Sequence, residues 1–118
     1  MPINQREVYL LPHPFDATAD HHPHIVLSVR EANQHEQTFI AIMITSSPRK
    51  DDYSFELTDD MFETPLRKSG CHARMHLLVL ALKEDISSRL LTRMKKTYFD
   101  ELMKSIGDLV FNFDFSPL

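Results

Sequence analysis

The chain has 118 residues, of which 42% are hydrophobic and 25% charged, and its formal net charge is −4. This length favours one domain that spans residues 1–118, and the composition excludes an intrinsically disordered chain. The acidic balance argues against a protein that coats nucleic acid without sequence preference, although it leaves room for a local basic groove.

Cysteine usage and hydropathy indicate the compartment. Cys71 is the only cysteine, so no internal disulfide can form, which is typical of a reducing environment. The sequence shows no signal peptide, and no apolar run approaches the roughly 20 residues of a membrane span. We therefore expect a cytoplasmic protein that does not enter a membrane.

The first half of the chain predicts three strands. Residues 7–11 combine β-branched, aromatic and aliphatic side chains and stop at prolines that a central strand would exclude. Residues 24–29 and 38–44 are almost continuously apolar, which is typical of strands buried on both faces. The polar segment between them, residues 30–37, fits either a turn of helix or a hairpin loop.

The second half predicts shorter strands. Residues 53–57 alternate in polarity and indicate a short strand, and residues 58–63 favour one helical turn. The apolar run 77–82 suits a strand better than a helix in this context, and residues 89–94 suggest a last short strand.

A C-terminal helix gives the clearest periodic signal. Thr97 followed by Asp100 resembles a capping box, and one apolar stripe runs through the segment after it. The stripe consists of Tyr98, Phe99, Leu102, Met103, Ile106, Leu109 and Val110. The tail 111–118 alternates aromatic with polar residues and predicts a terminal strand or an aromatic arm. Short strands followed by one helix favour a mainly β fold, a small and mostly antiparallel barrel with the helix packed on it.

Several short motifs follow one another along the chain, and their order is more informative than any one of them. They are Glu7-Val8-Tyr9-Leu10, then His22–Ser28 with Pro23 in second place, then Ile44-Thr45-Ser46, and finally the segment Lys95–Leu102 that leads into the last helix. In this order they resemble the MazF/PemK-like toxin family across nearly the whole chain.

The resemblance implies a small SH3-like barrel and a homodimer. It also implies sequence-specific cleavage of single-stranded RNA by attack of a 2′-hydroxyl on the adjacent phosphate, with no metal or other cofactor, and an antitoxin protein as partner. Two other functions remain open, because fold does not fix the target. The chain could be a non-catalytic relative that binds protein or nucleic acid, or a toxin directed at gyrase.

The resemblance also points to site residues. His22 stands where the family has an Arg, and Thr45 keeps the family's Thr. Histidine can act as acid or base near neutral pH, so we predict that His22 is catalytic, with Thr45 or Ser46 donating a hydrogen bond to the phosphate. The alternative is an inert loop histidine at position 22. The predicted RNA contacts are His24, Arg67, Lys68 and Arg74.

Imidazoles are common zinc ligands, and four of them gather in one stretch at His13, His21, His22 and His24. On a strand His22 and His24 would share a face that His21 does not, and Pro23 intervenes. No Cys or paired carboxylate has ligand spacing with them. We therefore predict no metal site.

Overall fold

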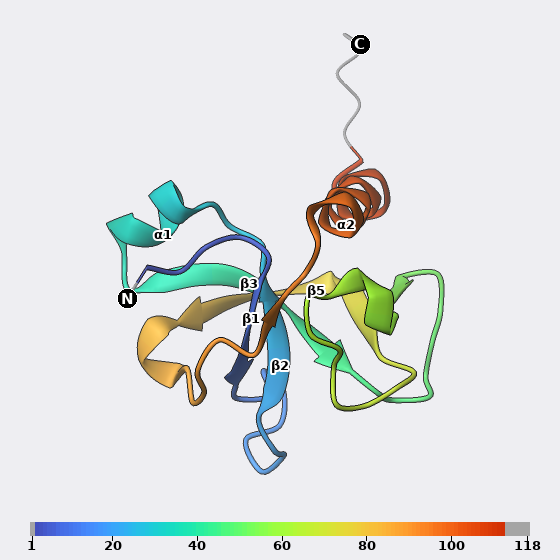
Figure 1. Cartoon of the computed structure of the whole chain (residues 1–118), viewed down its shortest axis with the longest axis horizontal. Helices are drawn as coiled ribbons and strands as arrows, with labels where there is room; N and C mark the ends of the chain where they lie inside the picture. Colours follow the sequence, from blue (N-terminus) through green and yellow to red (C-terminus); the bar gives the residue numbers. More distant parts are fainter. Residues whose placement is uncertain (1, 113–118) are drawn as a thin grey trace, which may run out of the picture.

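The computed structural model describes residues 2–112 (Figure 1). Six strands form one antiparallel sheet in the order β4-β5-β3-β2-β1-β6. Their bounds are β1 Glu7–Leu11, β2 His22–Val26, β3 Thr38–Thr45, β4 Ser54–Glu56, β5 His72–Leu82 and β6 Thr92–Arg93. The helices are α1 Arg30–His35 and α2 Lys96–Leu109, with two 3₁₀ turns, η1 Asp59–Met61 and η2 Lys83–Asp85. The prediction of a mainly β fold with a C-terminal helix is confirmed.

Within residues 2–112 the sheet is not closed into a barrel, so that part of the prediction is wrong. Its two edge strands, β4 and β6, are only three and two residues long and cannot carry a continuous ladder. The chain segments that follow them meet at one isolated bridge between Phe62 and Met94. Phe62 and Met94 belong to the same hydrophobic cluster as Phe99, Leu102 and Ile106 of α2.

Most strand boundaries agree with the sequence. β1 has the predicted bounds, β3 extends one residue further to Thr45, and the apolar run 77–82 belongs to a strand that begins at His72. β2 begins earlier than predicted, at His22. Its pairing with β3 begins only at His24, so Pro23 lies where no hydrogen bond to β3 is needed and a proline is tolerated. The polar segment after β2 forms the short helix α1.

Two hydrophobic clusters lie on opposite faces of the sheet, because successive side chains of a strand alternate. One contains Val8, Ile25, Ile42 and Ala73 together with Phe99, Leu102 and Ile106 of α2. The other contains Ile3, Tyr9, Leu11, Val26, Phe39, Ala41 and Ala81. The polar residues discussed below continue the second face beyond its apolar part.

The predicted capping box at Thr97 is wrong. α2 begins at Lys96 after Lys95, without a side-chain cap, and Asp100 pairs with Lys96 at 2.7 Å instead. The apolar stripe is confirmed at its centre, where Phe99, Leu102 and Ile106 are buried. Leu109 and Met103 are exposed. In the predicted strand or arm at 111–118, residues 113–118 lie outside the described part of the chain.

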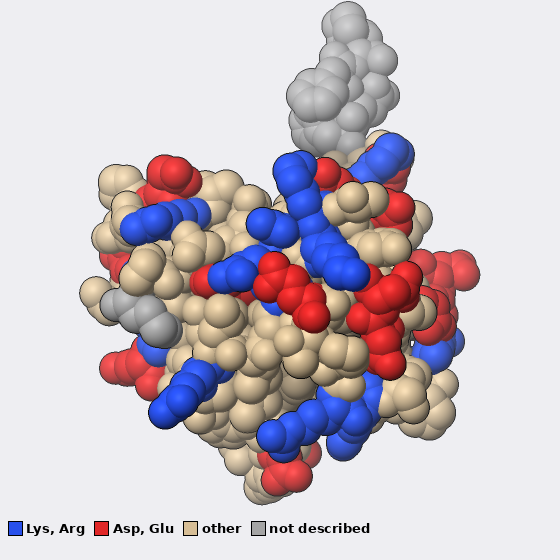
Figure 2. Space-filling model, in the orientation of Figure 1, with Lys and Arg blue, Asp and Glu red and all other residues tan. Residues whose placement is uncertain are grey.

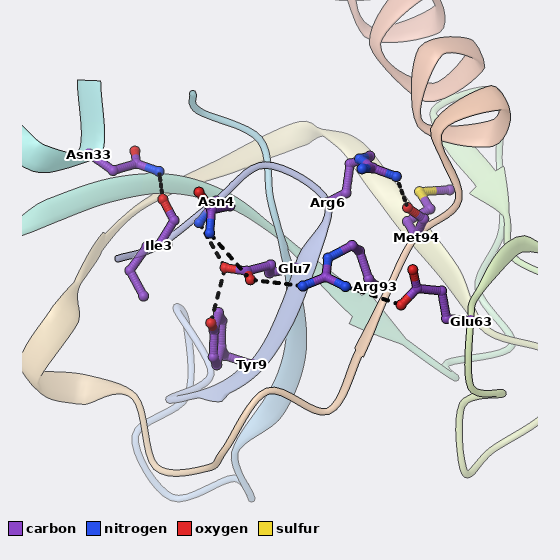
Figure 3. Close-up of polar contacts among 9 residues, drawn as sticks. All are labelled: Ile3, Asn4, Arg6, Glu7, Tyr9, Asn33, Glu63, Arg93 and Met94. Carbon is purple, nitrogen blue, oxygen red and sulfur yellow. Dashed lines mark hydrogen bonds and ion pairs between the residues drawn. The ribbon is translucent and has the colours of Figure 1, made fainter. Parts of the chain in front are cut away.

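A buried carboxylate ties the N-terminal segment to both β1 and β6 (Figure 3). Glu7 accepts hydrogen bonds from the backbone N–H of Asn4 at 2.7 Å and the hydroxyl of Tyr9 at 3.1 Å. It also pairs with its cross-strand neighbour Arg93 at 3.3 Å, and Arg93 pairs in turn with the exposed Glu63. Burial, together with the charge of Glu7, raises the pKa of Tyr9 to about 12, so this hydroxyl remains a donor.

Arg6 sits at the turn that leads into β1, with a φ of 76°. This left-handed conformation is uncommon for residues other than glycine. Its guanidinium donates to the Met94 carbonyl at 3.2 Å (Figure 3). Its backbone N–H donates to the Val26 carbonyl at 2.9 Å, and its own carbonyl accepts from the Met94 N–H at 2.8 Å. Three hydrogen bonds from two other segments therefore hold the turn.

The Glu7 network predicts unequal effects of removing the two carboxylates that share Arg93. Glu7→Ala leaves the Tyr9 hydroxyl, the Asn4 N–H and part of the Arg93 charge without partners, so it should lower the free energy of unfolding by about 2 to 4 kcal/mol. Glu63→Ala removes an exposed pair and should cost less than about 1 kcal/mol. Urea denaturation of both variants measures this, and equal losses would contradict it.

Candidate functional site

Strand register brings the two central predicted residues to one rim of the sheet. In the β2–β3 ladder His24 lies opposite Met43, so His22, two residues before His24, and Thr45, two residues after Met43, both lie just beyond the paired part at the same end of the two strands. In the β3–β5 ladder Thr45 pairs with His72. This rim, which carries the β1–β2 loop, lies away from α2 (Figure 1).

His22 is half-buried at the start of β2, and its orientation is set by the backbone. Its Nδ1 lies 2.8 Å from the carbonyl oxygen of Asp20. Because a carbonyl can only accept, Nδ1 carries the proton and the neutral ring keeps a lone pair on Nε2. No hydrogen bond to Nε2 comes from the described residues. An imidazole nitrogen of this kind can take up a proton from a substrate.

His24 is fully buried, so it offers no atom to RNA in this structure. Its Nδ1–H donates to the carbonyl of His22 at 2.8 Å. Burial lowers the pKa of His24 to about 4, which keeps the ring neutral beneath His22. Instead of the predicted RNA contact, His24 fixes the backbone that carries His22.

Thr45 ends β3 and stays half-buried, while Ser46 is exposed immediately after it. The hydroxyl oxygen of Thr45 accepts from the N–H of Ser47 at 3.2 Å, so its own proton remains available for a ligand. The buried His72 donates Nε2–H to the Ser47 carbonyl at 3.0 Å. Sequence reasoning gave His72 no part in the site, because its place beside Thr45 appears only with the register of β3 and β5.

The predicted cations differ in availability. Arg74 forms an ion pair with Asp51 at 2.9 Å, and its guanidinium holds the pKa of Asp51 below the usual range. Arg67 and Lys68 are exposed on the loop before β5, and their side chains make no hydrogen bond or ion pair with the rest of residues 2–112. Positive and negative side chains are interspersed on the face drawn in Figure 2. Among the predicted cations, the available positive charge is therefore confined to one loop rather than spread over a basic face.

The histidines near the rim are held by separate partners. His21 Nδ1 lies 2.6 Å from the Ser87 hydroxyl, whereas His22 and His24 bind backbone carbonyls. Among residues 2–112, no group of three or more His, Cys, Asp or Glu side chains is placed to hold a metal ion. Within the same residues, the helices are too short or too polar to cross a bilayer.

Comparison with known proteins identifies the family. Residues 4–110 match the family described as PemK-like, MazF-like toxin of type II toxin-antitoxin system. Because the match covers most of the chain, the protein belongs to this family of toxins. A comparison with curated protein sequences finds no match.

Solved structures of similar fold include MazF toxins. A MazF chain in a MazE–MazF complex from Deinococcus radiodurans superposes with a TM-score of 0.74 at 15% identity, over 94% of this chain and 98% of that one. A mycobacterial endoribonuclease in complex with its cognate antitoxin gives 0.72 at 11% identity, over 95% and 98%. The Mycobacterium tuberculosis toxin MazF-mt6 gives 0.68 at 14% identity, over 93% and 100%. At these identities the likeness shows the shared fold.

The buried His24 predicts how stability depends on pH. An unfolded histidine titrates near pH 6.5, whereas burial lowers the folded pKa of His24 to about 4. Between these values the unfolded chain binds more protons, so stability is lost as the pH falls. From pH 7 to pH 5 this group should cost about 2 kcal/mol.

Urea denaturation at both pH values measures the loss. His24→Gln removes the titrating group and should shrink the difference between pH 7 and pH 5 by about 2 kcal/mol. His35→Gln, at an exposed position of α1, should leave the difference as in the wild type. The same pH dependence in His24→Gln as in the wild type would contradict this account.

Proposed function

We propose that the protein is a sequence-specific endoribonuclease that cuts single-stranded RNA without a metal or other cofactor. The observation that carries the proposal is the rim geometry. There the start of β2, which carries His22, and the end of β3, which carries Thr45, lie at the same end of the sheet. In the neutral His22 ring Nε2 is the acceptor, and the Thr45 hydroxyl keeps its proton for a ligand. Membership in the toxin family supports the same conclusion. The whole chain, residues 1–118, acts as one domain.

The proposed reaction needs one proton carrier. His22 Nε2 takes the proton of the 2′-hydroxyl, and O2′ attacks the adjacent phosphorus. The P–O5′ bond breaks, its electron pair stays on O5′, and His22 returns the proton there. The products are a 2′,3′-cyclic phosphate and a 5′-hydroxyl. Thr45 and Ser46 donate hydrogen bonds to the phosphate as its charge builds up.

Binding and chemistry fall on different elements. Arg67 and Lys68, free within the described part of the chain, attract neighbouring phosphates from the loop before β5. Arg74 contributes only when phosphate displaces Asp51.

A second candidate is a non-catalytic relative that binds protein or nucleic acid at the same rim. Position 22, where the family has an Arg, is a His, and Arg74 cannot compensate for the missing charge while it is paired with Asp51. This pairing favours the non-catalytic relative. A toxin directed at gyrase is a third option, but nothing in this structure favours it.

We also propose an antitoxin partner and a homodimer, acting in the cytoplasm where RNA is found. The MazF structures from Deinococcus radiodurans include complexes with MazE, and a mycobacterial relative was solved with its cognate antitoxin. An exposed apolar stripe on β3 and β5, formed by Ile40, Leu80 and Leu82, supports a second subunit. Leu80 is 71% exposed, which is costly in a monomer.

The first test is cleavage of a long single-stranded RNA by the purified protein in EDTA. We expect discrete fragments with cyclic phosphate ends. His22→Ala should lower the rate by at least about 10²-fold, because it removes the proton carrier. His35→Ala, the same substitution at an exposed position of α1, should have no effect. An inactive wild type would reject the nuclease and favour the binding module, and full activity in His22→Ala would exclude the proposed role of His22.

The ion pair at Arg74 gives a second test. Asp51→Asn releases the guanidinium, so affinity for a 2′-O-methyl oligoribonucleotide should rise several-fold and its salt dependence should steepen by about one phosphate contact. Asp52→Asn removes a neighbouring acidic charge as a matched control and should change affinity less. Fluorescence anisotropy at several salt concentrations measures both. Equal effects would show that only net charge matters.

A further inference from the structure

A second imidazole lies directly beside His22. Leu11 at the end of β1 pairs with His22 at the start of β2, and this brings the loop after β1 against the rim. Two residues further on, the His13 ring meets the His22 ring edge to face, with centroids 5.0 Å apart and planes at 85°. Both rings are half-buried. The two side chains therefore form one unit at the proposed site.

Their backbone partners impose opposite tautomers. His13 Nδ1 lies 3.1 Å from the backbone N–H of Phe15, which can only donate. Nδ1 of His13 is therefore the acceptor, and the neutral ring carries its proton on Nε2. His22 has the reverse arrangement, since its Nδ1–H donates to Asp20. In the neutral rings, Nε2 of His13 is thus a donor and Nε2 of His22 is an acceptor.

We propose that His13 is a second catalytic residue, whose Nε2–H donates a hydrogen bond to a non-bridging phosphate oxygen while His22 Nε2 takes the 2′-hydroxyl proton. This role rests on the proposed ribonuclease function. It supplies the charge stabilisation that the family's Arg would provide at position 22. His13 keeps its proton throughout, and His22 alone carries the transferred proton from O2′ to O5′.

The loop that carries His13 is internally braced. Asp16 accepts hydrogen bonds from the hydroxyl and the N–H of Thr18, at 2.7 and 3.0 Å. At the other end of the loop, His21 binds Ser87. A donor fixed before substrate arrives stabilises developing charge without a reorganisation cost. The centroid of the exposed Phe15 ring lies 6.1 Å from that of His13, so Phe15 offers an aromatic face beside the proposed site on which a base can stack.

Glutamine separates a donor from a proton carrier. Its terminal amide can donate from the position of imidazole Nε2, but it cannot take up a proton. His13→Ala should lower kcat by about 10²- to 10³-fold, whereas His13→Gln should stay within about tenfold of the wild type. His22→Gln should be as inactive as His22→Ala. Circular dichroism and thermal unfolding check that the variants fold.

The outcomes distinguish the two proposals. A wild type that does not cleave RNA overturns the ribonuclease function and this role together. An active wild type with an unimpaired His13→Ala overturns the role of His13 alone. Equal losses in His13→Ala and His13→Gln overturn its role as a hydrogen-bond donor.

A second measurement does not depend on turnover. Long-range ¹⁵N–¹H correlation spectra should show the proton of neutral His13 on Nε2 and that of neutral His22 on Nδ1. An uncleavable 2′-O-methyl oligoribonucleotide should shift the Nε2 resonances of both rings. The opposite tautomer at His13, or shifts at His22 alone, would overturn the inference.

Discussion

The antiparallel pairing of β2 with β3, in the register that sets His24 opposite Met43, determines where the residues that these two strands contribute to the candidate site lie. Side chains alternate along a strand, so a slip of one residue would turn His24 toward the face that α2 covers and move Pro23 and Ile25 to the opposite face. The continuous apolar character of both strands favours burial but does not select the register by itself. The α1 connection and the hydrogen bonds of Leu27 and Ser28 to the Ile40 carbonyl, at 2.8 and 3.4 Å, lock it at the other end.

Buried polar groups then convert this register into a defined rim. His24 and His72 are both fully buried, and each donates one ring N–H to a backbone carbonyl, at His22 and Ser47 respectively. These carbonyls belong to the two segments that carry the predicted catalytic residues. The hydrogen bonds therefore act on the backbone rather than on a ligand, and they position His22 and Thr45 from beneath. Glu7 plays a comparable part at the opposite end of β1, where one carboxylate satisfies donors from three segments.

Features that depend on local interactions could be predicted from the sequence, and those that depend on contacts between distant residues could not. β1 could be predicted because Pro12 ends a local apolar run, and α2 because its stripe repeats with the helical period. The prediction of a closed barrel failed because closure depends on how the segments after β4 and β6 meet. They do so at Phe62 and Met94, which are 32 positions apart in the sequence. His22 and His24 share a face, and the pattern could not separate the half-buried ring from the buried one. Arg74 is unavailable to a phosphate because it pairs with Asp51, 23 residues away in the sequence, and no local pattern predicts such a tertiary contact.

A guanidinium and an imidazole pair solve the same electrostatic problem in different ways. Arg is charged at every accessible pH, so it stabilises a phosphate before and during reaction alike. In the proposed site a neutral His13 donates one hydrogen bond, and His22 becomes positive only after it has taken the 2′-hydroxyl proton. Positive charge then appears next to the phosphate as negative charge develops on it, which favours the transition state over the bound substrate. Ground-state binding must therefore come from elsewhere, and in the proposed function it comes from the exposed Arg67 and Lys68 before β5, which do not enter the chemistry. An acidic protein can act on RNA in this way because it needs cations in one loop rather than over a whole face.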